Sequence, residues 1–280
     1  METFTSPSAM RTWAESERSA GNRIAVVPTM GALHAGHLAL IEAGKERADR
    51  VVVTIFVNPL QFNEPSDFDA YPRPIDGDVE ACRQAGVAAV YAPTAATMYP
   101  PLFQTHVEPG ALAERLEGPM RPGHFRGVVT VVTKLFGATL PHVAMFGQKD
   151  YQQLAIVRQM AADLDGGVEI VGVPTVREPD GLALSSRNLL LTPEDRAAAV
   201  VVNRALRAAV ERHHDGEADA GALTGLARSI LDAEPRANVE YVELVDAVTL
   251  VPVDAVRSAA VILTAAWFGE VRLIDNQLLG

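Results

Sequence analysis

Short apolar runs alternate with longer amphipathic stretches through the first part of the chain. Residues 24–27 and 51–57 are continuous runs rich in β-branched side chains, which is typical of strands buried on both faces of a sheet. A helix-length stretch through Arg47 separates these runs, so they form a β-α-β unit whose strands are expected to pair in parallel. The alternation continues with predicted helices over 76–85, 125–138 and 151–164 and predicted strands over 88–92, 143–146 and 168–173. The pattern favours an α/β fold with a Rossmann-like open parallel sheet.

The pattern changes after about residue 175. The string Thr192-Pro193-Glu194-Asp195 is typical of a helix start, because Thr is a good N-cap, Pro suits the first helical position and acids suit the first turn. This helix is expected to run to about His213. A second helix over 220–233 and strands near 239–245, 259–263 and 271–274 follow. The sequence therefore predicts two domains, residues 1–175 with the parallel sheet and residues 176–280 as a smaller α+β domain.

The segment 28–37 carries the most specific chemistry. It reads Pro-Thr-Met-Gly-Ala-Leu-His-Ala-Gly-His and joins the first predicted strand to the following helix through a glycine turn. His34 and His37 fall on one face of the first helical turn, where free backbone N–H groups already favour an anion. Two imidazoles at that helix end make a site suited to a polyphosphate. The H-x-G-H spacing is typical of nucleotidyl-transferring Rossmann-like folds, so we expect ATP-driven chemistry at a phosphate.

Three further polar segments follow predicted strands or the expected domain boundary, at 56–62, 146–150 and 184–188. Each has an ordinary structural interpretation: Asn58 and Gln61 could satisfy loop backbone groups, Asp150 could cap a helix, and Ser-Ser-Arg-Asn could be a polar turn. Lys149 is unusual, because the chain has only three lysines and this one ends a strand. In an open parallel sheet, ligands bind beyond the carboxyl ends of the strands. The shared location of all four segments therefore favours one site.

Composition excludes several classes of protein. The net charge of −11 argues against nucleic-acid binding by general electrostatics. The single cysteine, Cys82, rules out an internal disulfide framework and a multi-cysteine zinc site, and it is expected to be a small core residue. No apolar run reaches membrane-spanning length and no apolar signal segment is seen, so we expect a soluble, cytoplasmic protein. The sequence has no G-x-x-x-x-G-K-[ST] motif, so it is not a P-loop NTPase, and it has no G-x-G-x-x-G dinucleotide fingerprint. It also has no H-E-x-x-H motif that would support a protein-bound transition metal.

With these segments in view, the chain resembles the pantothenate synthetases (pantoate–β-alanine ligases) from about residue 24 to residue 276. The matching strings are PTMGALHAGH, FVNPLQF, DAYPR, HFRGV, GQKDYQQL and LSSRN. Two positions depart from the family pattern, which usually has Glu at the place of Gln148 and Met at the place of Leu184. Both positions act in the family chiefly through backbone or packing, so the resemblance still implies an active enzyme.

The resemblance implies an ATP-dependent ligase with a two-step reaction. The carboxylate of (R)-pantoate attacks the α-phosphate of ATP, which gives pantoyl adenylate and pyrophosphate. The amine of β-alanine then attacks the acyl carbon and releases pantothenate and AMP. Mg²⁺ is expected to bridge the phosphates with few protein ligands. The family is commonly a homodimer, and no nucleic acid or membrane partner is implied.

The resemblance also assigns residues. His37, His34 and Lys149 are expected to be catalytic, because such phosphate chemistry depends on positioning and charge stabilisation. Main-chain groups of Met30, Gly147 and Val176 are expected to hold the nucleotide. The full ATP-binding set is Met30, Gly31, Ala32, Leu33, His34, Ala35, Gly36 and His37, then Gly147, Gln148, Lys149 and Asp150, then Val176, then Leu184, Ser185, Ser186 and Arg187. The pantoate-binding set is Gln61, Gln153, Asn58 and Tyr71, and Gln61 is also expected to place β-alanine.

Three other functions stay open on the residues alone. A nucleotidyltransferase could use the same H-x-G-H machinery, but it would need a cationic pocket for a second phosphate, whereas these segments are rich in amides. A class I tRNA synthetase is disfavoured by a short, acidic chain without a basic RNA-binding domain. A nucleotide-sensing module without turnover would not need both histidines, Lys149 and the Ser-Ser-Arg loop.

Overall fold

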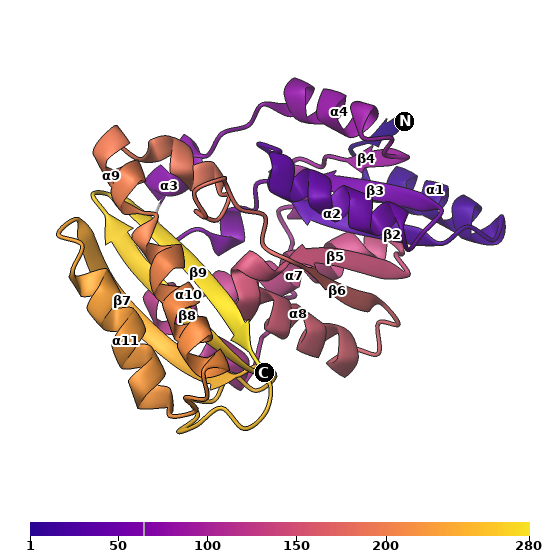
Figure 1. The fold of residues 1–280 in the computed structure, drawn as a ribbon. Coiled ribbons are helices and arrows are strands. Elements are labelled where there is room, and N and C mark those ends of the chain that lie inside the picture. The colour runs from indigo at the N-terminus through magenta and orange to yellow at the C-terminus, as the bar shows by residue number, and fades with distance from the viewer. Residues whose placement is uncertain (64) are drawn as a thin grey trace. The chain divides into compact units, whose positions relative to one another are not determined.

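A computed structural model describes residues 1–63 and 65–280, with their side chains except those of residues 65–67. The chain divides into two compact units (Figure 1). The first unit holds Met1–Gln148 and Gln152–Pro174, and the second holds Lys149–Tyr151 and Thr175–Gly280. This division differs from the expected boundary at 175 mainly in the short segment Lys149–Tyr151, which groups with the C-terminal residues.

The first unit contains a six-stranded sheet in the order β1-β4-β3-β2-β5-β6, and each neighbouring pair of its strands is parallel. The strands are β1 (Glu2–Phe4), β2 (Ile24–Thr29), β3 (Arg50–Ile55), β4 (Ala89–Tyr91), β5 (Val143–Gly147) and β6 (Glu169–Val173). The predicted open parallel sheet is confirmed. Because β2 leads to β3 on one side and has β5 on its other side, the strand order reverses between β2 and β5, where such sheets bind ligands.

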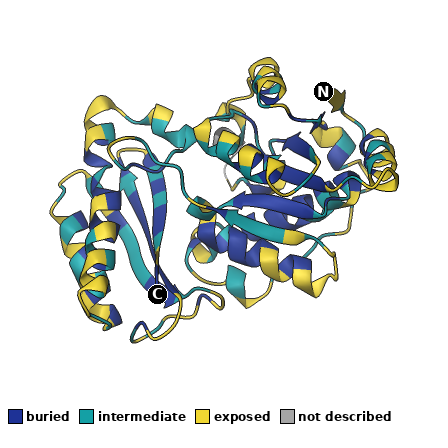
Figure 2. Cartoon of the chain, turned by 45° about the vertical axis from the view of Figure 1, so that its right-hand side comes forward, coloured by how far each residue is buried: buried dark blue, intermediate teal, exposed yellow. Residues whose placement is uncertain are grey.

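Helices cover both faces of this sheet. On one face, α1 (Pro7–Ser19), α7 (His124–Thr139) and α8 (Tyr151–Asp163) contribute to one apolar cluster. On the other face, α2 (Ala35–Lys45) and α4 (Ile75–Gln84) contribute to a second cluster, which includes Cys82. The connections contain three short helices, α3 (Pro65–Ala70), α5 (Ala95–Met98) and α6 (Glu117–Met120). They also contain three 3₁₀ turns, η1 (Pro59–Gln61), η2 (Ala111–Ala113) and η3 (Gln148–Asp150). Figure 2 shows buried residues along the strands and the inner faces of the helices.

Cys82 is a core residue, as expected. Its side chain is fully buried, and burial, with a smaller contribution from the charge of Asp78, raises the pKa of its thiol to about 11. At neutral pH the thiol is therefore protonated and unreactive.

The second unit contains an antiparallel sheet in the order β7-β8-β9, formed by β7 (Ala237–Asp246), β8 (Ala260–Phe268) and β9 (Val271–Leu279). The helices α9 (Pro193–Ala198), α10 (Val201–His214) and α11 (Ala220–Asp232) pack with this sheet around their own apolar cluster. The 3₁₀ turn η4 (Ser186–Leu190) precedes α9. The predicted smaller α+β part is confirmed, and β8 and β9 run longer than expected.

The prediction of a single helix from Thr192 to His213 is wrong, because the structure has two helices there. Thr192 caps α9 as predicted, since its Oγ1 accepts the Asp195 N–H at 3.1 Å. The helix is then interrupted at Ala199 and Val200, where the Val202 N–H donates to the Ala199 carbonyl at 3.1 Å. This i→i−3 bond replaces the usual i→i−4 bond, so the ladder is broken although both residues keep right-handed helical angles.

The sequence reading did not assign β1 or α1. A usable signal was present, because Ser6 is the N-cap of α1 and Pro7 is its first residue. The Ser6 Oγ accepts the Ala9 N–H at 3.2 Å. In the described part of the chain, no helix combines the length and apolar composition needed to cross a membrane.

Candidate active site

The turn after β2 is held from two directions. The Thr29 hydroxyl donates to the Thr54 carbonyl at 2.8 Å and accepts the Gly31 N–H at 3.1 Å. The buried Asp78 carboxylate accepts the N–H groups of Ala32 at 2.9 Å and Leu33 at 2.8 Å. Gly31 has φ +86°, and a Cβ there would lie 2.8 Å from an Asp78 oxygen. Glycine is therefore needed at position 31 for both conformation and space.

The two histidines form a reciprocal cap on α2. His34 is the N-cap, and its Nδ1 accepts the Gly36 N–H at 3.1 Å. The Nδ1 of His37 accepts the His34 N–H at 3.2 Å, and the two ring centroids are 4.2 Å apart. Because each Nδ1 accepts a backbone N–H, each neutral ring carries its proton on Nε2. The cap therefore presents two Nε2–H donors from one helix N-terminus, an arrangement that suits phosphate oxygens.

Asn58 and Gln61 form a buried amide pair beside this turn. The Asn58 Nδ2 donates to Gln61 Oε1 at 3.0 Å and to the Gly127 carbonyl at 3.1 Å. The Asn58 Oδ1 accepts the Tyr99 hydroxyl at 2.8 Å and the Leu60 N–H at 3.3 Å. Asn58 is 1% exposed, so its side chain serves mainly to orient the Gln61 amide.

Gln61 connects the second predicted segment to the first. Its Nε2 lies 3.1 Å from the sulfur of Met30, which follows β2. Its backbone carbonyl accepts from His124 Nδ1 at 2.8 Å and from Arg121 Nη2 at 3.4 Å. Because Asn58 holds Oε1 and the Met30 sulfur accepts one N–H of the amide, the second N–H of Nε2 is the one that can donate to a ligand.

Two other residues of the predicted pantoate set are placed in the first unit. Tyr71 is half-buried, and its ring meets Phe62 edge-on at 5.7 Å between centroids. Gln153 is half-buried on α8. The preceding residue, Gln152, is 3% exposed and holds the backbone of Glu117, Leu112 and Arg115. The two glutamines therefore differ, since Gln152 has a structural role and Gln153 is the more accessible amide.

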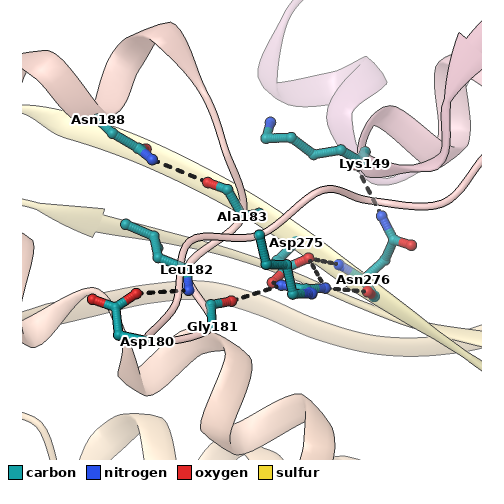
Figure 3. Close-up of polar contacts among 9 residues, drawn as sticks. Lys149, Asp180, Gly181, Leu182, Ala183, Asn188, Asp275 and Asn276 are labelled. Atoms are coloured by element: carbon teal, nitrogen blue, oxygen red, sulfur yellow. Dashed lines mark hydrogen bonds and ion pairs between the residues drawn. The ribbon is translucent and has the colours of Figure 1, made fainter. Parts of the chain in front are cut away.

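In the second unit, Lys149 is held through its backbone. Its carbonyl accepts Asn276 Nδ2 at 2.9 Å, while its side chain is 19% exposed and its ammonium lies 3.9 Å from an Asp150 oxygen. Figure 3 shows the Lys149 ammonium pointing away from the Asn276 amide. The charged end of Lys149 is therefore available to a ligand while its backbone is fixed.

Residues 176–184 form a small hairpin that leads into η4. The Leu184 N–H donates to the Val176 carbonyl at 3.0 Å, and the Glu178 N–H donates to the Leu182 carbonyl at 2.8 Å. At its base, Arg177 makes a two-pronged ion pair with Asp275, at 2.6 and 2.9 Å. Asp275 is 3% exposed, so this pair anchors the hairpin to β9.

The Ser-Ser-Arg segment follows this hairpin directly. The Ser185 Oγ caps η4 by accepting the Arg187 N–H at 3.3 Å, and Asn188 donates to the Ala183 carbonyl at 3.0 Å (Figure 3). Leu184, Ser185, Ser186 and Arg187 are all partly exposed. The segment therefore has the polar turn that the sequence allowed, shaped by its capping bonds. The same bonds leave its side chains partly accessible, as a binding loop would need.

The structure also identifies supporting residues that the sequence reading missed. Asp78, in the first turn of α4, holds the Gly31 turn from a position 46 residues downstream of Ala32. The sequence pattern likewise indicates no role in the site for His124, Asp275 or Asn276. The string His124-Phe-Arg-Gly-Val belonged to the family resemblance, so it was the one available signal for His124. No local pattern marks Asp78 or Asp275, because their partners are distant in sequence.

The fold and this helix N-terminus at the reversal of strand order define a Rossmann-like nucleotide-binding α/β protein. A family model described as pantoate-beta-alanine ligase matches residues 2–278. The pantothenate synthetase of Syntrophotalea carbinolica is 50% identical over 262 residues, which cover 94% of this chain and 93% of that protein. The chain therefore belongs to the pantoate–β-alanine ligase family.

Solved structures agree with this assignment. A pantothenate synthetase structure from Thermus thermophilus has a TM-score of 0.94 and 44% identity, with 99% of each chain covered. A pantoate-beta-alanine ligase from Francisella tularensis, complexed with beta-gamma ATP and beta-alanine, has a TM-score of 0.81 and 34% identity, with 99% of this chain and 97% of that chain covered. The match extends over both units, so the family assignment is not limited to the nucleotide-binding fold.

Proposed function

We propose that this protein condenses (R)-pantoate with β-alanine in an ATP-dependent reaction through pantoyl adenylate. The observation that carries the proposal is the reciprocal histidine cap, which leaves Nε2 as the protonated nitrogen of both neutral rings at the N-terminus of α2, in a chain of this family. In the first step a pantoate carboxylate oxygen bonds to the α-phosphorus and the bond to pyrophosphate breaks. In the second step the neutral amine of β-alanine bonds to the acyl carbon, AMP leaves and the nitrogen loses a proton.

His34 and His37 act on the phosphates in this proposal. Hydrogen-bond donors aimed at the position where charge develops stabilise a transition state most effectively. Pyrophosphate gains negative charge as it leaves, so Nε2–H groups that are already oriented by backbone bonds lose little entropy in binding it. The Met30 main chain contacts the nucleotide. The turn and the helix end around the nucleotide are shaped by Gly31, Ala32, Leu33, Ala35 and Gly36.

The C-terminal residues of the predicted ATP set supply cations and further main-chain contacts. Lys149 provides a point charge on a fixed backbone, and Arg187 provides a planar group suited to two phosphate oxygens. Ser185 and Ser186 offer hydroxyls from the same loop. The remaining proposed nucleotide contacts are Gly147, Gln148, Asp150, Val176 and Leu184.

Amides bind pantoate in this proposal. Gln61 donates its oriented NH₂ group to pantoate and later helps to place β-alanine, and Gln153 provides a second amide. Neutral amides leave the pantoate carboxylate nucleophilic, whereas a close arginine would hold its charge. Tyr71 closes the pocket, and Asn58 contributes through its bond to Gln61.

Mg²⁺ is proposed to enter with ATP. Within the described residues, no three His, Cys, Asp or Glu side chains cluster as a dedicated metal site. Phosphate oxygens and water are the ligands that Mg²⁺ prefers at nucleotide sites, and bound Mg²⁺ neutralises phosphate charge. A homodimeric state and a cytoplasmic location are likewise proposals, and light scattering of the purified protein tests the first.

Isotope transfer tests the proposed mechanism most directly. With ATP, β-alanine and pantoate labelled with ¹⁸O in its carboxylate, we expect AMP to carry one labelled oxygen, because an adenylate transfers that oxygen to the phosphate. Without β-alanine, pyrophosphate should still be released, and this release should require pantoate. Pantothenate formed with unlabelled AMP would overturn the adenylate, and no pantothenate from all three substrates would overturn the function.

A further inference from the structure

The segment Lys149–Tyr151 is covalently part of the parallel-sheet region but belongs by its contacts to the second unit. It lies between β5 and the body of α8, both of which are in the first unit. Two bonds tie it to the second unit, one to β9 and one to the residue that follows β7. Asn276 Nδ2 donates to the Lys149 carbonyl at 2.9 Å, and the Tyr151 hydroxyl donates to the Ala247 carbonyl at 3.0 Å.

The backbone of Asn276 is itself held by its neighbours. It is 6% exposed, and its backbone N–H donates to an Asp275 oxygen at 2.8 Å. That same oxygen accepts Arg177 Nη2 at 2.9 Å, and Arg177 also lies 3.5 Å from the Asn276 carbonyl. The Asp275–Asn276 step of β9 therefore contacts both the base of the 176–184 hairpin and the backbone of Lys149 (Figure 3).

The Lys149 side chain needs such support. A lysine side chain has four rotatable bonds, so the position of its ammonium depends strongly on where its backbone is fixed. The ammonium lies 3.9 Å from the carboxylate of Asp150, which is half exposed, and such an ion pair is too weak to define the direction of the side chain. By contrast, the bond from the Asn276 amide, a side chain that is only 6% exposed, holds the peptide group at Lys149.

From this arrangement we propose that Asn276 is a positioning residue for Lys149, and that it places the Lys149 ammonium in fixed register with the loop that carries Ser185 and Arg187. The proposal rests on the proposed role of Lys149 at the ATP phosphates. Asn276 acts through Lys149 and is not assigned a contact with substrate. Loss of its amide donor should therefore impair the step that needs the ammonium, which is adenylate formation.

Half-reaction kinetics of the full-length protein test this role. In Asn276→Leu, which has a similar shape without the donor, pantoate-dependent pyrophosphate release should slow by roughly 10- to 100-fold in single turnovers. Attack of β-alanine on adenylate supplied to the enzyme should stay within about twofold of wild type. Gln277→Leu changes the next residue of β9, for which the structure describes no side-chain hydrogen bond, and should leave both steps unchanged.

A second measurement follows Lys149 without any turnover. Reductive ¹³C-methylation labels the N-terminus and the three lysines, and Lys149→Arg identifies the Lys149 signal by its loss. In Asn276→Leu the Lys149 signal should shift or broaden, while the signals of Lys45 and Lys134 stay in place. Asn276→Asp, which keeps the shape and replaces the donor with an acceptor, takes the place of Asn276→Leu if that variant does not fold.

The outcomes separate this proposal from the proposed function. Normal adenylation in a folded Asn276 variant, or equal slowing of both half-reactions with an unmoved Lys149 signal, overturns the positioning role. If the wild type releases no pyrophosphate from ATP and pantoate, the proposed function fails, and the Lys149 signal alone decides the structural claim. A shifted signal then supports the Asn276–Lys149 coupling, and an unmoved one overturns it.

Discussion

At the scale of single residues, the histidine pair combines a structural and a chemical role in the same rings. In His34, Nδ1 caps the helix and Nε2 carries the proton that is proposed to reach the phosphates, so substitution by alanine removes both functions at once. A residue that caps without a ring separates them. Asparagine is such a residue, because its side-chain oxygen is a good N-cap acceptor.

We therefore predict different effects for His34→Asn and His34→Ala. Both should slow adenylate formation by about 10²-fold, since each loses the Nε2–H donor. Only His34→Ala should lose stability, by about 1 kcal/mol, since it also loses the cap. Single-turnover kinetics and urea unfolding measure the two effects. A wild-type adenylation rate in His34→Asn would show that the ring does not act on the phosphates.

At the scale of elements, the carboxyl ends of β2 and β5 could be found from the sequence because their chemistry is local. The string from Pro28 to His37 contains a strand end, a turn and a helix start in one continuous stretch, and the structure confirms all three. The supports of the site could not be found in this way. Asp78 and Asp275 reach partners 46 and 98 residues away, and a pattern within one element cannot show such a pairing.

The Arg177–Asp275 pair gives a prediction about the hairpin and β9. The Arg177 side chain is 20% exposed and that of Asp275 is 3% exposed, so removing one partner leaves a poorly solvated charge. Arg177→Met or Asp275→Leu alone should lower the free energy of unfolding by about 3–5 kcal/mol, and the double variant should lose less than either single one. A double-mutant cycle by urea unfolding measures this coupling. Additive losses would contradict it.

His142, which directly precedes β5 and bonds to the first residue of β2, gives a prediction about how stability depends on pH. Its Nδ1 accepts the Ile24 N–H at 2.9 Å, and burial first, then Arg18 and Arg23, hold its pKa below the ordinary value of 6.5. Because the unfolded chain takes up this proton more readily, the contribution to stability is complete above about pH 6.5 and is lost as the pH falls through the lower folded pKa.

His142→Asn should keep an acceptor near the position of Nδ1 and remove this titration. We expect the free energy of unfolding to fall less between pH 8 and pH 5.5 in the variant than in the wild type. Urea titrations at the two pH values measure the difference, with His142→Ala as the variant that loses the acceptor and the titration together. Identical pH slopes in wild type and His142→Asn would rule out this histidine as a source.

At the scale of the whole molecule, each unit has its own core. The first unit buries two apolar clusters on the two faces of the parallel sheet, and the second buries one between its helices and the antiparallel sheet. The sequence predicted two domains from the change in element pattern near residue 175. Whether the units unfold independently is a prediction, and the two tryptophans can test it because Trp13 lies in α1 and Trp267 lies in β8.

Matched core substitutions should show this independence. Ile41 in α2 and Leu206 in α10 are both fully buried, and replacing either by alanine should lower the stability of its own unit by about 2–5 kcal/mol. In Trp267→Phe, which keeps Trp13, Ile41→Ala should lower the urea midpoint and Leu206→Ala should leave it nearly unchanged. In Trp13→Phe, which keeps Trp267, the effects should be reversed. If either core substitution moves both fluorescence transitions equally, the two cores unfold as one cooperative domain and the prediction of two domains is wrong.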